Sequence, residues 1–148
     1  MTSFSFRLSA AILCSGGLFA GFVGPVRAEA EMPQRELTVG MYRIDAEVAA
    51  TQEDRMRGLM QRKAMPQNRG MLFVFTGEDI RRFWMRNTYV PLDMVFLDAR
   101  RVVVGIEANA VPLDETSRGP DAPAQYVVEV RAGAAQQHGV DVGARAEF

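Results

Sequence analysis

Two carboxylic acids in apolar surroundings are the side chains of this 148-residue chain best suited to chemistry. Asp93 ends the stretch FWMRNTYVPLD, residues 83–93, in which polar residues interrupt an apolar region. Glu129 lies inside the apolar segment YVVEV, residues 126–130. A carboxyl in such surroundings needs hydrogen-bond donors, or else its pKa rises, and either outcome suits ligand binding or acid–base chemistry.

These acids and the polar residues near them define a predicted ligand-binding site. We expect it at a pocket mouth between residues 84–93 and a long loop over residues 109–124, because long loops are often functional. Its candidate residues are Arg62, Trp84, Arg86, Asn87, Thr88, Asp93 and Glu129. In the structural alternative, Asp93 caps its own turn or pairs with an arginine, Trp84 belongs to the core, and Glu129 faces solvent.

Catalysis by the common nucleophile or metal constellations is not expected. Cys14 and His138 are the single cysteine and the single histidine, which is too few for a zinc site and disfavours Ser-His or Cys-His catalysis. We predict no metal and no cofactor. Two alternatives stay open: a hydrolase with Asp93 and Glu129 as paired carboxylates, and Cu(I) bound by methionine thioethers.

The first 28 residues have the layout of a secretory signal peptide. Arg7 precedes an apolar run that Gly24-Pro25 ends, and Val26 and Ala28 suit the cleavage enzyme. The run is short for a membrane span, so cleavage after Ala28 is favoured over a retained N-terminal anchor. The protein is therefore predicted to be periplasmic or secreted.

The remaining chain is predicted to form one domain behind a short linker. Residues 29–36 are polar and are expected to be a flexible linker, and residues 37–148 a single β-rich domain. Loss of Cys14 leaves no disulfide, and loss of Arg7 and Arg27 changes the formal net charge from −1 to −3. That charge gives no reason to expect nucleic acid or an anionic membrane surface as partner. The expected partner is a polar small molecule, with no membrane span after signal cleavage.

Short strands dominate the predicted domain. Apolar runs and alternations predict strands over residues 37–44, 46–49, 70–75, 82–87, 92–97, 102–108 and 125–130, with an edge strand near 145–148. Thr51 and Asp54 form a capping box for a helix expected to reach about Lys63, and residues 133–139 predict one helical turn. Six to seven short strands with one short α-helix and one helical turn indicate a mainly β fold, either a β sandwich or an open barrel.

Five short motifs occur in the order typical of a known family. They are GLMQR at residues 58–62, GMLF at 70–73, FWMRNT at 83–88, PLD at 91–93, and VEV followed by Ala132-Gly133 at 128–133. Through them the chain resembles the domain of unknown function 192 family, or uncharacterised protein family 0127, over nearly all of residues 44–148. The resemblance implies a compact β-rich fold, often behind a signal or anchor, and no agreed activity, cofactor or catalytic residue. Gly143-Ala144 stands where the family usually has Gly-Asp, which puts in doubt any chemistry that needs that aspartate.

Non-covalent binding of a polar small molecule or carbohydrate-like ligand by an exported domain is the favoured function, ahead of catalysis. The alternatives are the paired-carboxylate hydrolase and a structural or envelope assembly factor. Candidate residues that converge in one cavity would favour binding, whereas an exposed apolar patch without a cavity would favour assembly.

Overall fold

Seven β-strands form one continuous sheet in the computed structural model, which describes residues 31–148. The predicted signal peptide, residues 1–28, lies outside the described residues. The elements in chain order are β1 (Gln34–Val39), β2 (Tyr42–Ala49), α1 (Gln52–Arg57), β3 (Arg69–Ile80), β4 (Leu92–Leu97), β5 (Val103–Ala110), β6 (Pro123–Arg131), α2 (Ala134–Gln137) and β7 (Ala146–Glu147).

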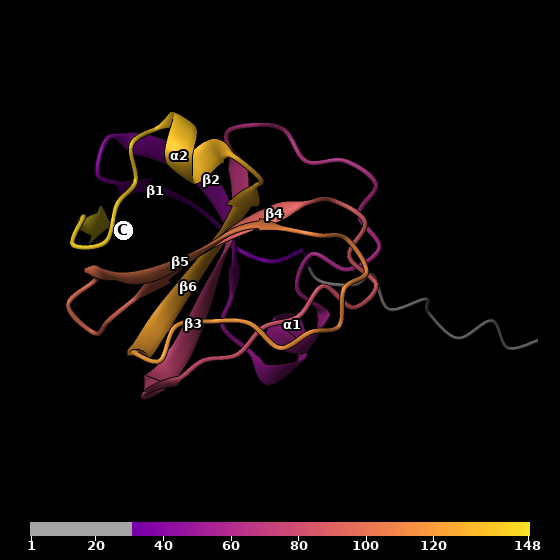
Figure 1. Ribbon diagram of the computed structural model, residues 1–148, viewed down its shortest axis with the longest axis horizontal. Helices are drawn as coiled ribbons and strands as arrows, with labels where there is room; N and C mark the ends of the chain where they lie inside the picture. The colour runs from indigo at the N-terminus through magenta and orange to yellow at the C-terminus, as the bar shows by residue number, and fades with distance from the viewer. Residues whose placement is uncertain (1–30) are drawn as a thin grey trace, which may run out of the picture. The chain divides into compact units, whose positions relative to one another are not determined.

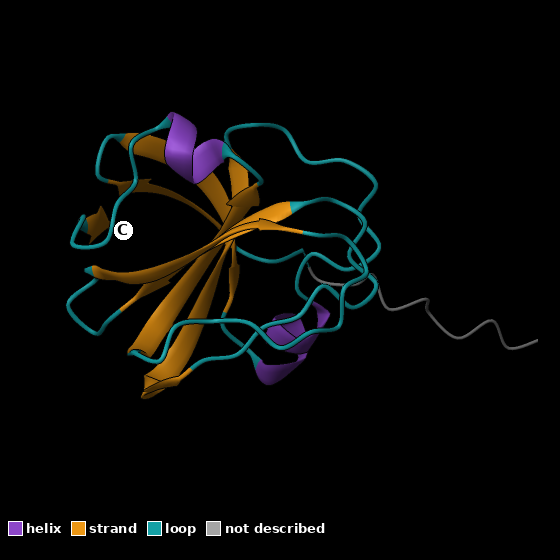
Figure 2. Cartoon of the chain, viewed as in Figure 1, coloured by secondary structure: helices purple, strands orange, loops and turns teal. Residues whose placement is uncertain are grey.

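The sheet curls into a half-barrel whose two edge strands are joined by the C-terminal segment (Figures 1 and 2). Its strand order is β5-β4-β6-β3-β2-β1-β7, and only the β2–β3 pair is parallel. β7 pairs with β1, while the amide of Val103 in β5 donates to the carbonyl of Ala144 at 2.9 Å. The predicted mainly β fold with two short helical elements is confirmed, and its form is the barrel-like one.

Two apolar clusters lie on opposite faces of the curled sheet. Side chains alternate between the faces along a strand, and β4 shows this most clearly because all six of its residues are buried. Val95 and Leu97 join the inner cluster, which also includes residues of β1, β2, β7 and α2. Met94 and Phe96 join the outer cluster, together with residues that lie between α1 and β3 and between β3 and β4.

Three predicted boundaries were wrong. The predicted strand 82–87 forms only an isolated bridge between Phe83 and Arg118, because this segment pairs with the later loop instead of joining the sheet. Gly40, with a φ of +59°, starts a tight turn that divides the predicted strand 37–44 between β1 and β2. Residues 34–36, expected in the linker, belong to β1 and pair with β2.

The capping box of α1 forms as predicted, but the helix is shorter than expected. The Asp54 amide donates to the Thr51 hydroxyl at 3.0 Å, and that hydroxyl donates to the Asp54 carboxylate at 2.6 Å. The helix ends at Arg57 because Gly58 has φ +50° and ψ −136°, a conformation open almost only to glycine. The predicted continuation to Lys63 is therefore replaced by turns, and the helical turn α2 forms within the predicted residues 133–139.

We expect Gly58→Ala to destabilise the protein more than Gly40→Ala. Both glycines have a positive φ, but a Cβ at Gly58 would lie 3.3 Å from the Phe73 ring, whereas nothing lies within 4 Å of one at Gly40. Backbone strain alone gives a loss of about 1 kcal/mol in the free energy of unfolding. Urea unfolding of both variants measures the difference, and equal losses would show that the Phe73 contact is unimportant.

Candidate functional site

A cavity of about 550 Å³ lies between α1 and residues 82–88. We call it the Glu129 pocket; its lining comes from α1 and the turn after it (residues 52 and 55–60), from β3 (Phe73 and Phe75), from residues 82–84 and 86–88, and from Glu129 of β6. Phe73 and Glu129 are 1% and 4% exposed, so they lie at its base. Met56 and Trp84 are 68% and 47% exposed, so they lie at its mouth.

The two sides of the pocket are held together by a backbone hydrogen bond. The Gln61 amide, in the turn after α1, donates to the Asn87 carbonyl at 2.7 Å. Both residues have a positive φ, 62° for Gln61 and 52° for Asn87. Asparagine tolerates this conformation better than most residues, which explains why Asn87 suits the corner. This bond fixes the turn after α1 against the corner at Asn87.

The long loop supports the pocket from behind. Residues 111–122 run along the segment that forms one wall, and the Phe83 and Arg118 backbones exchange two hydrogen bonds of 2.9 Å. The Met85 amide also donates to the Asp114 carbonyl at 2.8 Å. The Glu129 pocket does not lie between residues 84–93 and this loop, where a pocket was predicted, because its opposite wall is α1.

Glu129 is a buried carboxylic acid without a polar partner among the described residues. Its cross-strand neighbours are Met71 in β3 and Met94 in β4, both buried and both apolar. Burial raises the pKa of Glu129 from its usual 4.5 to about 8. At pH 7 the protonated form therefore outnumbers the carboxylate by about ten to one, and the group can both donate and accept a hydrogen bond.

Asp93 lies on the other face of the sheet from Glu129 and is fully buried. Its carboxylate accepts from the Asn109 amide at 2.8 Å and from the Ala135 amide at 3.0 Å. Asn109 belongs to a β5 bulge, where the register against β4 shifts by one residue, and Ala135 lies in the first turn of α2. Asp93 thus binds the amides of a bulge and a helix start. Neither its own turn nor an arginine supplies its partners.

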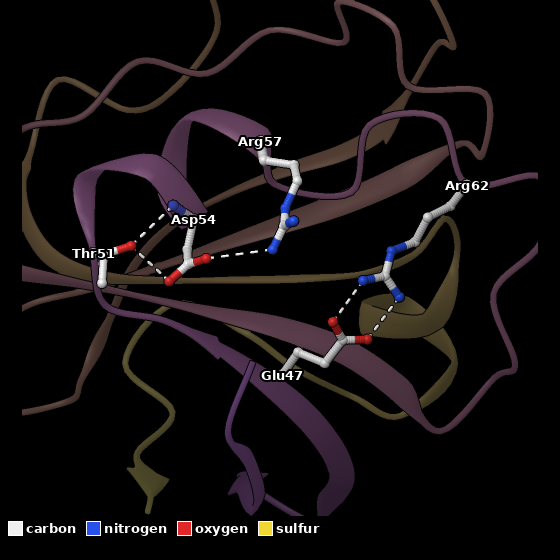
Figure 3. A network of polar contacts seen from close by, with 5 residues as sticks. All are labelled: Glu47, Thr51, Asp54, Arg57 and Arg62. Atoms are coloured by element: carbon white, nitrogen blue, oxygen red, sulfur yellow. Dashed lines mark hydrogen bonds and ion pairs between the residues drawn. The ribbon is translucent and has the colours of Figure 1, made fainter. Parts of the chain in front are cut away.

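The Arg62 side chain also lies outside the pocket lining, where it makes a structural contact. Its guanidinium makes two hydrogen bonds, 2.5 and 2.6 Å long, to the Glu47 carboxylate of β2 (Figure 3). In the same view Arg57 contacts Asp54 of the capping box, at 3.4 Å. The Arg62 pair anchors the turn after α1 to the sheet.

Five of the seven predicted site residues therefore line one pocket, namely Trp84, Arg86, Asn87, Thr88 and Glu129. Asp93 and Arg62 do not, and the two carboxyls of the hydrolase alternative lie on opposite faces of the sheet. Sequence analysis missed Arg55 and the aromatic base, Phe73 and Phe75. The GMLF motif, which ends at Phe73, was the available signal, but it gave no indication of which face Phe73 occupies.

Among residues 31–148, no group of three or more His, Cys, Asp or Glu side chains has an arrangement suited to a metal ion. In the same range, every helix is too short and too polar to cross a membrane.

We expect Asp93→Asn to lower the free energy of unfolding by about 3 kcal/mol. The asparagine amide can accept from only one of the two backbone amides and places its own NH2 group against the other donor. Asp141→Asn, at an exposed position, is the matched control and should change stability by less than about 0.5 kcal/mol. Urea unfolding at pH 7 gives both values; similar midpoints for the two variants would contradict the assigned role.

We expect Glu129→Gln to remove a pH dependence of stability. The folded pKa of Glu129 lies above its unfolded value of 4.5, so the wild type binds the extra proton only when folded. Its stability should therefore fall by about 1.4 kcal/mol per pH unit from pH 4.5 to about 8, relative to the variant, and level off above. Denaturation series at several pH values measure this, and parallel curves for the two proteins would contradict the raised pKa.

Comparison with known proteins agrees with the motif resemblance. The family model DUF192, described as "Uncharacterized ACR, COG1430", matches residues 35–148. A protein of unknown function from Novosphingobium aromaticivorans DSM 12444 is 35% identical in sequence, with a TM-score of 0.77, over 85% of this chain and 91% of that one. A protein described as a putative transcription regulator from Sinorhizobium meliloti 1021 is 33% identical, with a TM-score of 0.78, over 81% and 97% of the two chains. No curated protein matches the chain.

The family match begins inside β1 and extends through β7, so it includes both walls and the base of the Glu129 pocket. We conclude that this chain belongs to the DUF192 family of uncharacterised proteins.

Proposed function

We propose that this protein binds a small amphipathic molecule in the Glu129 pocket without forming a covalent bond to it. The observation that carries the proposal is the Glu129 carboxyl, which is buried at the base of an open cavity and has no polar partner among residues 31–148. Buried polar groups in folded proteins are nearly always hydrogen-bonded. A ligand that brings a hydrogen-bonding group to this position would satisfy the carboxyl.

The walls of the pocket favour a ligand with an apolar body. Phe73, Phe75, Phe83 and Leu59 contribute aromatic and aliphatic surface, and small-molecule sites are typically apolar with a few placed polar groups. A carbohydrate needs polar partners along its length, so an aromatic or aliphatic molecule with polar groups only at its ends suits this lining better. The polar groups available to a ligand are thus Glu129 at the base and the polar side chains at the mouth.

Export belongs to the same proposal. The signal-like residues 1–28 support an extracytoplasmic place of action. Fractionation of expressing cells would test this independently of ligand binding, since a precursor that stays in the cytoplasm at full length would contradict it.

Trp84 makes the binding proposal directly testable. It is the single tryptophan of the chain and lies at the pocket mouth, so all tryptophan fluorescence reports on this site. A screen of small amphipathic compounds should find some that change Trp84 emission in a saturable way and raise the melting temperature. For such compounds, Glu129→Leu should weaken binding by about 3 to 10 times, which corresponds to one hydrogen bond of about 0.5–1.5 kcal/mol.

Glu107→Gln is the control, because Glu107 belongs to β5 and does not line the pocket. Compounds that bind the wild type and Glu129→Leu equally well would remove the reason for placing the ligand against Glu129.

A further inference from the structure

The Glu129 pocket is lined by cations far more than by anions. Four arginines line it, Arg55, Arg57, Arg82 and Arg86, and its single acidic lining residue is Glu129. Because burial raises the pKa of Glu129 to about 8, that residue carries little negative charge at pH 7. Whether the pocket favours an anionic or a cationic ligand therefore depends on how far nearby groups neutralise the positive charges of the arginines.

Two of the four arginines are paired with carboxylates. Arg57 lies 3.4 Å from the Asp54 carboxylate, and Arg82 forms an ion pair with Asp121. In both cases the positive charge at the pocket is offset by an aspartate that does not line it.

The other two arginines keep their charge unpaired. The Arg55 guanidinium donates to the carbonyls of Ala50 and Val74, which are neutral acceptors. The Arg86 side chain has no hydrogen bond or ion pair among the described residues and lies over the Trp84 ring, with its guanidinium carbon 5.5 Å from the ring centroid. It is exposed, so its donors are free to turn toward a ligand at the mouth.

The cationic mouth is separate from the carboxyl at the base. Desolvation by burial accounts for the raised pKa of Glu129, with no lowering by a nearby guanidinium. Arg86 is exposed, whereas Glu129 is buried beside Met71 and Met94. A bound molecule would therefore meet positive charge first, then aromatic surface, and then a neutral hydrogen-bonding group.

We infer that the Glu129 pocket selects an amphipathic organic anion, whose charged group contacts Arg86 beside Trp84 and whose apolar body lies against Phe73 and Phe75. This inference rests on the proposed function and adds the charge of the ligand and its orientation. A charge-assisted hydrogen bond from a guanidinium is about twice as strong as a neutral one. A ligand cation would meet the unpaired charges of Arg55 and Arg86, and a neutral ligand would leave them unused.

Three probes with the same apolar body test the inference. The readout is Trp84 fluorescence of the protein as purified from expressing cells, with any native processing completed. The probes are 3-phenylpropionate, 3-phenylpropanol and 3-phenylpropylamine, which are an anion, a neutral alcohol and a cation at pH 7. In about 0.05 M salt the anion should bind about 3 to 10 times more tightly than the alcohol, and the amine most weakly. In about 0.5 M salt this order should flatten, because exposed charges are screened.

Arg86→Gln should lower affinity for 3-phenylpropionate by about 3 to 10 times and leave the alcohol unchanged. Arg35→Gln is the control with the same charge change, at an exposed β1 position outside the pocket lining.

A fourth probe, octanoate, is compared with 3-phenylpropionate to distinguish an aliphatic from an aromatic body. Tight binding of either anion that depends on Arg86 supports the inference.

Two outcomes would overturn the inference in different ways. If the alcohol or the amine binds as tightly as the anion in low salt, selection for an anion is wrong while binding in the pocket stands. If all four probes leave Trp84 emission unchanged up to their solubility limits, the inference is wrong, whereas the proposed binding function fails only if the wider compound screen also finds no binder.

Discussion

The buried carboxylate of Asp93 is the constraint on which much of this fold depends. A charged group at a fully buried position is expensive unless it is hydrogen-bonded, and here each carboxylate oxygen accepts from a backbone amide of a distant part of the chain. One comes from the bulge in β5 and the other from the start of α2. The carboxylate thereby links β4 to an edge strand and to the helix that covers the inner face. Burial, and secondarily the negative charge of Asp93, also raises the pKa of Tyr42 in β2.

The contrast between Asp93 and Glu129 shows how environment separates two similar acids. Both lie on central strands and both are buried, but only Asp93 has donors aimed at it. Glu129 is flanked by methionines and opens on a cavity. A carboxylate that is fully satisfied by its own protein contributes to stability and has no capacity left for a ligand. A carboxyl that is unsatisfied has that capacity, at the expense of stability.

Sequence patterns predicted the strands well because the spacing of apolar residues along a strand follows from whether one or both of its faces are buried. The alternation in β4, the run at Gly70–Phe75 and the capping box at Thr51 were all confirmed. The end of α1 was missed because the decisive property of Gly58 is its backbone conformation, which residue spacing does not encode. The strand predicted at 82–87 failed for another reason: its partner is the loop near Arg118, a pairing set by tertiary structure.

The lining of the pocket was predicted from the sequence only where it is local in sequence. Residues 84 and 86–88 line the pocket because they belong to one corner of the chain. Met85, in the same corner, is buried and does not line it. The wall formed by α1 and the aromatic base come from distant segments, and a single sequence does not show which segments meet. The face occupied by Asp93 was correctly predicted to include Val95 and Leu97, but its partners, two backbone amides, have no signature in residue type.

The join between β7 and β1 has a consequence for how the chain reaches its native state. Residues 38–39 pair with residues 146–147, and the start of β5 bonds to residues 143–144. During synthesis the β1–β2 hairpin is therefore complete long before its neighbour β7 exists, and the inner apolar face stays open until residues 143–147 emerge. Such long-range pairing slows folding and exposes unpaired strand edges in the meantime. A nascent chain of this kind would remain accessible to chaperones until residues 143–147 have been synthesised.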